Sequence, residues 1–215
     1  MKNNTWWVVL FILAPFGYAA YLYPSLSEQI PIHFGVDGKP DNWASKNSIF
    51  MLPVILGFVN FFTWLLLTNI DKIDPKQAKG DNKETVNLLS LFLSAALCGL
   101  SLLILYSEAH ENVAIDKLLF GALGILFMGL GFFMPKLKQN YFAGYKLPWT
   151  LESKENWEKT HQLAGKWWMG GGALQLLFAI LLKGEILFYF FMTITVLVAL
   201  IPAIYSYLQF KQTKN

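Results

Sequence analysis

Residues 86–106 read VNLLSLFLSAALCGLSLLILY, a run of 21 residues without a charged side chain. A helix of about 20 apolar residues spans the hydrocarbon core of a bilayer. Over all 215 residues, 55% are hydrophobic and only 14% are charged, whereas about 25% are charged in ordinary globular domains. A soluble fold of this length cannot cover so much apolar surface, so we predict an integral membrane protein.

Five further apolar segments share this character, which predicts an all-α polytopic membrane protein with six transmembrane helices. The first and fourth segments are short for a span. The fifth is marginal unless the Lys residues beside it reach towards opposite interfaces. The six predicted spans are residues 6–23, 49–70, 86–106, 118–134, 167–182 and 186–207.

The basic residues, all 17 of them Lys, predict the orientation of these spans. With the N-terminus inside, 13 Lys residues lie in the inner segments and only 4 lie in the outer loops. Cytoplasmic loops are enriched in Lys and Arg, so we expect a bacterial inner-membrane protein with both termini in the cytoplasm. The Lys residues are scattered rather than gathered on one domain, which argues against direct binding of nucleic acid.

The cores of the predicted spans contain no Asp, Glu, Lys or His. An ionisable side chain at the bilayer centre costs about 2.5–3.5 kcal/mol on insertion scales and is typical of ion and proton pathways. Its absence counts against a proton-coupled transporter. A small-solute transporter or channel remains the alternative function, and it would need a pore lined by Asn60, Asn87 and Gln175.

Small residues within the spans predict close packing between helices. Ala95 and Gly99 form a small-xxx-small pair in the third predicted span. The fourth predicted span has four such positions, Gly121, Gly124, Gly129 and Gly131.

The first outer loop, residues 24–48, contains a strong turn signal at Asp37-Gly38. Apolar residues alternate with others before it, which predicts two short strands or extended arms joined by that turn. His33 is a pH-sensitive binding group, a metal ligand or an ordinary hydrogen-bonded histidine. The candidate functional residues of this loop are Pro31, His33, Phe34 and Trp43.

The fourth loop, residues 135–166, is long for a helical bundle and is predicted to face the cytoplasm. Thr150 or Ser153 can cap the start of a helix there. Trp157, Thr160, His161 and Ala164 fall on one stripe at i, i+3, i+4 and i+7. We therefore predict an amphipathic helix that lies along the inner membrane surface before the fifth span.

The sequence contains only weak indications of a catalytic or metal-binding site. Glu158 and His161 have the i, i+3 spacing of di-iron bundles, but those sites need two such pairs and further carboxylates. A membrane enzyme would have to use His161 with Glu158, or His33 with Asp37, and no nucleophile or metal signature accompanies either pair. We expect no enzymatic activity, no cofactor and no metal.

The fourth loop nevertheless has a recognisable signature. The stretch NYFAGYKLPWTL at residues 140–151, followed by Trp157, His161 and residues 164–166, resembles the SdpI family of bacterial membrane proteins. The residues PIHF at 31–34, with Gly38, Pro40 and Trp43, resemble a short domain of unknown function found at the N-terminus of many such proteins. Where the family usually has an Arg, this chain has Lys146, which keeps the charge but not the bidentate geometry.

The resemblance implies that the protein protects a bacterial membrane from a secreted peptide toxin. In the best-known branch of the family, the role extends to holding a cytoplasmic transcriptional repressor at the membrane. It also implies two units, a two-helix unit in residues 1–70 and an SdpI-like four-helix unit in residues 86–215. The residues expected to carry the family role, by scaffolding the loop or by partner contact, are Asn140, Gly144, Lys146, Pro148, Trp149, Thr150, Trp157 and His161.

Overall fold

The computed structural model describes residues 4–75, 82–110 and 113–213. Four of the Lys residues counted above, Lys2, Lys76, Lys79 and Lys214, lie outside the described residues. The helices are α1 (Thr5–Leu22), α2 (Met51–Thr68), α3 (Ile70–Ile73), α4 (Lys83–Glu108), α5 (Ile115–Phe133), α6 (Pro148–Glu152), α7 (Lys154–Leu181) and α8 (Gly184–Thr213). Short 3-10 turns are η1 (Tyr23–Ser25), η2 (Lys46–Phe50) and η3 (Met134–Lys136), and the strands are β1 (Gln29–Phe34) and β2 (Pro40–Ser45).

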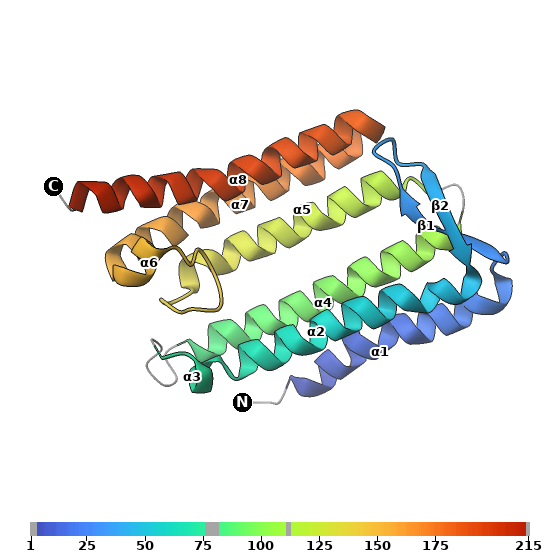
Figure 1. The fold of residues 1–215 in the computed structure, drawn as a ribbon, viewed down its shortest axis with the longest axis horizontal. Coiled ribbons are helices and arrows are strands. Elements are labelled where there is room, and N and C mark those ends of the chain that lie inside the picture. Colours follow the sequence, from blue (N-terminus) through green and yellow to red (C-terminus); the bar gives the residue numbers. More distant parts are fainter. Residues whose placement is uncertain (1–3, 76–81, 111–112, 214–215) are drawn as a thin grey trace.

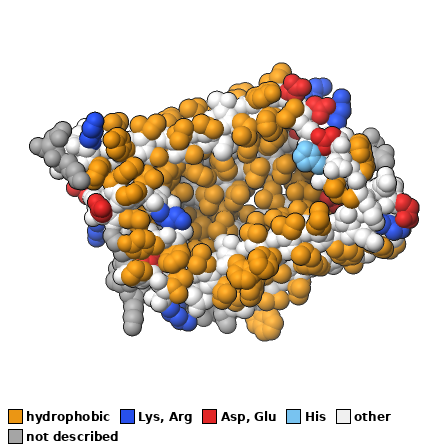
Figure 2. Space-filling view, in the orientation of Figure 1, with side chains coloured by type: hydrophobic (Ala, Val, Ile, Leu, Met, Phe, Trp, Pro, Cys, Tyr) orange, Lys and Arg blue, Asp and Glu red, His pale blue; other side chains and the backbone are white. Residues whose placement is uncertain are grey.

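The long helices run side by side in a bundle, with both ends of the chain at one end of it and the two strands at the other (Figure 1). One group consists of α1, α2 and α4, and the other of α5, α7 and α8. Helix α4 also packs against α5 and thereby joins the two groups. Apolar side chains cover most of the face of the bundle seen in Figure 2, and many large apolar residues are exposed, as expected where lipid rather than water surrounds the helices.

Five helical segments are long and apolar enough to cross a membrane: Thr5–Ser25, Lys46–Thr68, Lys83–Glu108, Ile115–Lys136 and Gly184–Thr213. They coincide with five of the six predicted spans. The fifth predicted span, residues 167–182, falls in the C-terminal part of α7, which is not among these five segments. The chain is a mostly helical multi-pass membrane protein.

The amphipathic helix expected along the membrane surface is not a separate element. Its residues form the first turns of α7, which continues without a break from Lys154 to Leu181. The predicted stripe is correct, because Trp157, Thr160, His161 and Ala164 are all buried. That stripe faces protein rather than lipid headgroups, since α7 packs along α5 and against α8.

Glycines bring α5 and α7 into backbone contact. A Cβ atom at Gly124 would lie 2.8 Å from the carbonyl oxygen of Gly172, and one at Gly172 would lie 2.5 Å from that of Gly124. Gly131 and Gly165 repeat this arrangement two helical turns further along. A Cβ atom at Gly131 would lie 2.8 Å from the carbonyl oxygen of Gly165, and one at Gly165 would lie 2.9 Å from that of Gly131. The predicted close packing of the fourth span is therefore confirmed.

The small residues Gly129 and Gly99 do not contribute to the contact between α5 and α7. A Cβ atom at Gly129 would overlap the ring of Phe92 on α4, so glycine at this position leaves room for that ring. Gly99 has nothing within 4 Å of its Cβ position, and Ala95 is exposed beside it. The predicted packing role of the Ala95–Gly99 pair is wrong for the described chain, because its face of α4 points outwards.

The outer loop folds as the predicted hairpin, with β1 and β2 antiparallel and Pro31 opposite Trp43. Gly38 at its tip has a φ of +77°, which favours glycine. Ile30 anchors the hairpin in a buried cluster with Ala19, Leu22, Ile49 and Leu105. The tip also reaches the second group of helices: a Cβ atom at Gly38 would lie 3.2 Å from Asp116 at the start of α5.

The α5–α7 contact predicts opposite effects for two neighbouring glycines of α7. Gly172→Ala should lower the melting temperature of the detergent-solubilised protein by several degrees, because its methyl group meets the backbone of α5. Gly170→Ala should leave the melting temperature unchanged or raise it, because nothing lies within 4 Å of that position and Ala stabilises a helix by up to about 1 kcal/mol relative to Gly. Equal melting temperatures for the two variants would contradict the packing described here.

Candidate functional site

The segment between η3 and α7, residues 137–153 and here termed the motif loop, folds around the buried side chain of Asn140. The Asn140 carbonyl Oδ1 accepts hydrogen bonds from the backbone N–H groups of Phe142 (2.8 Å) and Ala143 (2.7 Å). Its Nδ2 donates to the carbonyl oxygens of Lys138 (2.8 Å) and Ala143 (3.0 Å). One side chain thus replaces the regular backbone pairing that this irregular segment lacks.

His161, on the second turn of α7, holds the next part of the motif loop. Its Nε2 accepts a hydrogen bond from the backbone N–H of Tyr145 (3.0 Å), and its Nδ1 donates to the carbonyl oxygen of Trp157 (2.8 Å). Gly144 precedes Tyr145 with a φ of +103°, and a Cβ atom there would overlap Nε2 of His161. Glycine is therefore required at residue 144 by both its backbone conformation and its neighbour.

These bonds define the protonation state of His161. An imidazole that accepts at Nε2 and donates at Nδ1 is neutral. Burial lowers the pKa of His161 to about 4, although the hydrogen bond to the Trp157 carbonyl acts in the opposite direction. The ring also stacks on Trp157, with 3.9 Å between the ring centroids, and both ring nitrogens are occupied by the fold rather than free for a metal.

Trp157 fixes the start of the motif loop to α7. Its side chain is 1% exposed, and its Nε1 donates to the carbonyl oxygen of Leu137 at 2.7 Å. The indole belongs to an apolar cluster with residues of α2, α3, α4 and α5, including Leu67, Ile70 and Phe133. Trp157 thus connects the motif loop to both groups of helices.

Thr150 closes the end of the motif loop. Its hydroxyl donates a hydrogen bond to the carbonyl oxygen of Tyr145 (2.6 Å). The same hydroxyl accepts a hydrogen bond from the backbone N–H of Leu147 (3.0 Å). Pro148 occupies the first turn of α6, where a missing N–H costs nothing. Gln139 donates to the carbonyl oxygens of Thr150 and Leu151 (2.7 and 2.9 Å) and ties the two ends of the loop together.

Helix α8 completes the site from the other side. Asn156 donates to the carbonyl oxygen of Ser206 (2.9 Å) and accepts from the hydroxyl groups of Ser206 (2.6 Å) and Thr160 (3.0 Å). Trp149 packs its ring against Tyr207 and Phe210, with centroid distances of 5.3 and 5.9 Å. The motif loop is therefore held between α7 and α8.

Tyr145 and Trp168 are structural partners that sequence reasoning missed. Trp168 Nε1 donates to the Tyr145 hydroxyl at 2.8 Å, and that hydroxyl donates to the carbonyl oxygen of Val198 at 2.9 Å. Burial raises the pKa of the Tyr145 hydroxyl, and the hydrogen bond from Trp168 lowers it less. Tyr145 is part of the signature at residues 140–151, and this position was the sequence feature that could have identified it.

Among the eight predicted residues of the loop and α7, two groups emerge. Asn140, Gly144, Thr150, Trp157 and His161 form the hydrogen-bonded and packed interior described above. Lys146 and Pro148 are exposed, and Trp149 is half-buried. The exposed pair lies on the outer surface of the motif loop, where it is available to a partner.

The four residues predicted in the outer loop lie together on the hairpin. His33 and Asp41 are 2.5 Å apart (Nδ1 to Oδ1), and both side chains are exposed. His33 therefore pairs with Asp41 on the facing strand and not with Asp37, the partner considered from the sequence. Trp43 is 52% exposed, and Pro31 and Phe34 are half-buried.

The residues that a solute pore would need do not come together. Asn60 of α2 donates to the carbonyl oxygen of Ser94 on α4 at 3.3 Å. Gln175 of α7 donates to Thr195 of α8 at 3.1 Å, in the other group of helices. In the part of the chain that the structure describes, no group of three or more His, Cys, Asp or Glu side chains is placed to hold a metal ion.

Comparison with known proteins gives this loop its context. The model of the SdpI/YfhL protein family matches residues 136–206, which include the motif loop, α7 and most of α8. The Immunity protein SdpI of Bacillus subtilis (strain 168) is 30% identical over 167 residues, which cover 77% of this chain and 76% of that protein. The chain belongs to the SdpI/YfhL family.

A second match covers the other end of this SdpI/YfhL family member. A domain of unknown function, DUF1648, matches residues 10–57, which contain most of α1, the whole hairpin and the start of α2. The two matches correspond to the two segments whose motifs stood out in the sequence. No solved structure matches the chain.

The neutral state of His161 predicts a specific pH dependence. An unfolded histidine titrates near pH 6.5, while burial holds the pKa of His161 at about 4, so the unfolded state binds more protons between these values. The contribution of His161 to stability should therefore fall as the pH drops from 7 to 5, by at most about 1.4 kcal/mol per pH unit. Melting temperatures of the detergent-solubilised protein at each pH measure the slope.

His161→Gln should be less stable than the parent protein at pH 7, and the difference in stability between the two should shrink as the pH drops from 7 to 5. His110→Gln is the matched control, because His110 is exposed and its ring contacts Tyr106 at the end of α4. This control should keep the parent slope. An unchanged slope in His161→Gln would show that another group causes the acid sensitivity.

Proposed function

We propose that this protein is an immunity protein of the bacterial cytoplasmic membrane that protects its host from a secreted peptide toxin. The observation that carries the proposal is the 30% identity to the Immunity protein SdpI across three quarters of both chains. The geometry is compatible with a binding role, because the motif loop is a rigid, hydrogen-bonded surface. Its histidine is neutral and fully occupied by structural bonds, which leaves it no free nitrogen for acid–base catalysis.

We also propose that the chain crosses the membrane six times, with α7 as the fifth span and both termini in the cytoplasm. A helix of 28 residues is about 42 Å long, which exceeds the roughly 30 Å of the hydrocarbon core. Helix α7 packs along α5 and against α8, and its apolar C-terminal part, residues 167–182, would cross the hydrocarbon core. The charged side chains of its first turns, Lys154, Glu155, Glu158 and Lys159, are exposed and would lie outside that core, beside the motif loop. The excess of Lys at the end of the bundle that carries the termini supports the orientation.

In this orientation the hairpin faces outwards and the motif loop faces the cytoplasm. We propose that the hairpin surface around Trp43 and His33 meets the toxin. We propose that the exposed face of the motif loop, with Lys146 and Pro148, is the place where a cytoplasmic repressor would be held. We further propose that residues 1–70 and 86–215 are two sequence units; in support, one family model matches residues 10–57, within the first, and the other matches residues 136–206, within the second.

Cysteine labelling tests the orientation. Cys98 is the single cysteine of the chain and is buried, so Cys98→Ser gives a background without a thiol. In intact cells a membrane-impermeant maleimide should label Lys39→Cys at the hairpin tip and should not label Lys146→Cys in the motif loop. Both positions are exposed, and permeabilised cells should therefore label both. Labelling of Lys146→Cys in intact cells would reverse the proposed orientation.

A killing assay tests the function. Expression of this protein in a toxin-sensitive bacterium should raise survival in the presence of a secreted peptide toxin, and the Bacillus subtilis relative serves as the positive control. Gly144→Ala should abolish protection, because the added methyl group displaces His161. Trp43→Ala should reduce protection several-fold while the amount of membrane-inserted protein stays the same.

Lys154→Ala is the control for a surface change outside both proposed contact surfaces, because this side chain is 82% exposed. It should protect as well as the parent protein. Unchanged killing of cells that express the parent protein, with every peptide toxin against which the relative protects, would refute the immunity role.

A further inference from the structure

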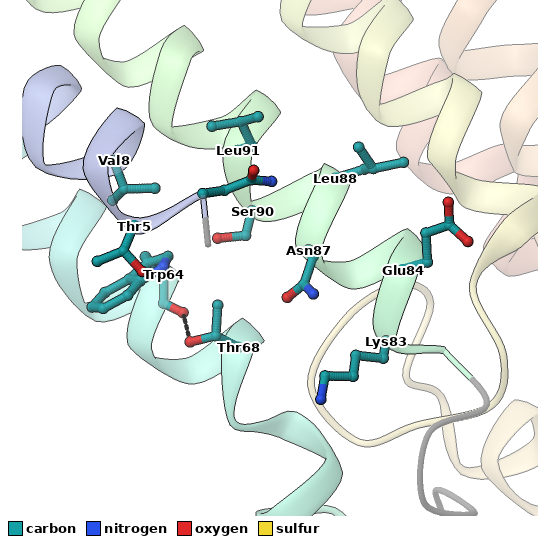
Figure 3. Close-up of a pocket in the computed structure, with 11 residues that line it drawn as sticks. Thr5, Val8, Trp64, Thr68, Lys83, Glu84, Asn87, Leu88, Ser90 and Leu91 are labelled. Carbon is teal, nitrogen blue, oxygen red and sulfur yellow. Dashed lines mark hydrogen bonds between the residues drawn. The ribbon is translucent and has the colours of Figure 1, made fainter. Parts of the chain in front are cut away.

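The hairpin of β1 and β2 lies across the end of the bundle opposite the two termini (Figure 1). The protein also has a pocket of about 750 Å³ between α1, α2 and α4, whose lining includes Trp64, Thr68 and Lys83 (Figure 3). That pocket lies at the end of the bundle that carries the termini, so in the orientation proposed above it faces the cytoplasm. A secreted peptide therefore meets the hairpin first.

The backbone of β2 has polar groups that point away from β1. The N–H of Lys46 donates to the carbonyl oxygen of Glu28 (3.0 Å), so these residues form a hydrogen-bonded pair at the base of the hairpin. Hydrogen-bonded and non-hydrogen-bonded pairs alternate along an antiparallel ladder. Pro31 and Trp43 are the third pair after this one and are therefore a non-hydrogen-bonded pair. The N–H and C=O of Trp43 consequently point to the outer edge of β2.

The position of Pro31 supports the same assignment from the facing strand. Proline has no N–H to donate and is found in sheets where that group would point outwards. It also interrupts the outer edge of β1, which packs against α4. Strand β2 pairs with β1 alone among the described residues, and outside the ladder of the hairpin no described backbone group bonds to Trp43. The open edge of this small sheet is thus the outer edge of β2.

This open edge is short. The register of the hairpin shifts on both sides of His33, so regular pairing is confined to the base, where Gln29–Pro31 faces Trp43–Ser45. Gln29 and Ser45 form another non-hydrogen-bonded pair, by the same alternation. The outward groups of the regular part of β2 are therefore the N–H and C=O of Trp43 and the N–H of Ser45.

The side chain of Trp43 lies beside this edge. Ile30 is 1% exposed and belongs to the cluster that anchors the hairpin on the helices. Successive side chains of a strand point to opposite faces, so Pro31 and its partner Trp43 lie on the face away from the helices. The indole can therefore pack against an apolar side chain of a peptide that runs along β2.

The hairpin is held at both ends before any partner arrives. Ile30 fixes its base, and its tip contacts the second group of helices. A Cβ atom at Gly184, in the turn between α7 and α8, would lie 3.5 Å from the carbonyl oxygen of Asp37. An edge that is already held in its extended shape loses little conformational freedom on binding.

We propose that the outer edge of β2 binds an extended segment of the secreted peptide toxin as an added strand. An unpaired strand edge is a template for another strand, and main-chain hydrogen bonds supply affinity in this mode of recognition. A helical segment does not fit, because its backbone groups already bond to one another. The inference rests on the proposed immunity function and specifies how the hairpin surface recognises the toxin.

Two variants of Trp43 separate the backbone contribution from that of the side chain in the killing assay. Trp43→Ala and Trp43→Pro both lack the indole, but only Trp43→Pro also lacks the outward N–H. Both should be inserted in equal amounts and have equal melting temperatures, because proline is tolerated where its missing N–H would point outwards. Trp43→Pro should protect about five-fold less well than Trp43→Ala, as expected for one lost hydrogen bond.

Gln29→Pro makes the same backbone change on the outer edge of β1. Gln29 is exposed, and its N–H also points outwards, so this variant should protect as well as the parent protein. Hydrogen exchange of the detergent-solubilised parent provides a second measurement, with the peptide toxin against which the Bacillus subtilis relative protects as the probe. The toxin should slow exchange of the Trp43 amide about ten-fold or more and should leave the Gln29 amide unchanged.

The outcomes separate this inference from the immunity function. If the parent protein protects, but Trp43→Pro protects as well as Trp43→Ala or the toxin leaves exchange at Trp43 unchanged, strand addition is wrong and the immunity function stands. If the parent protein does not protect, both are wrong. Disulfide-linked dimers of Trp43→Cys in the Cys98→Ser background, formed in membranes without toxin, would assign the edge to a second copy of this chain instead.

Discussion

The backbone contact between α5 and α7 is the constraint on which the rest of the second group of helices depends. Gly124 meets Gly172, and Gly131 meets Gly165, so the two helices approach each other more closely than any side chain would allow. Lipid offers apolar helices no hydrophobic reason to associate, and close van der Waals packing at small residues takes its place. This contact sets the position of α7 and so places Trp157 and His161 beneath the segment that leaves α5.

Once α7 is held in this way, the motif loop can fold with few regular backbone bonds. Asn140 and His161 each satisfy backbone groups that neither a helix nor a strand would satisfy. A second link comes from the first group of helices, because Asp74, after α3, accepts a hydrogen bond from the backbone N–H of Tyr141 at 2.8 Å. At the opposite end Asp116 contacts the hairpin tip and accepts from the N–H of Gly184 at 2.7 Å. The two groups of helices are thus connected at both ends of the bundle.

Much of this fold follows from local sequence. Apolar runs located five helices to within a few residues, as in 118–134 against Ile115–Phe133, because a bilayer imposes the length of its spans. The Asp37-Gly38 turn predicted the hairpin, since only a few residues favour such a turn. The stripe through Trp157 and His161 predicted a buried face, but periodicity does not say what buries it. A lipid surface was expected, and α5 and α8 were found.

The contacts that sequence could not predict join residues far apart in the chain. Tyr145 bonds to Trp168 and to a carbonyl oxygen of α8 that is 53 positions away, and no local pattern encodes such a pair. Gly99 and Gly124 have similar surroundings in the sequence, yet only Gly124 faces another helix. The direction in which a small residue points is set by the packing of the whole bundle.

The signature of the motif loop is therefore mostly a description of how the loop folds. Asn140, Thr150 and His161 are buried and hydrogen-bond to backbone groups of the loop and of α7, so a partner cannot reach these three side chains without unfolding the loop. Lys146 and Pro148 lie on its surface. An exposed ammonium group can meet a negative charge in many directions, whereas a guanidinium group binds a carboxylate through two parallel bonds. The side chains that hold the loop together are therefore separate from the exposed side chains that a partner would meet first.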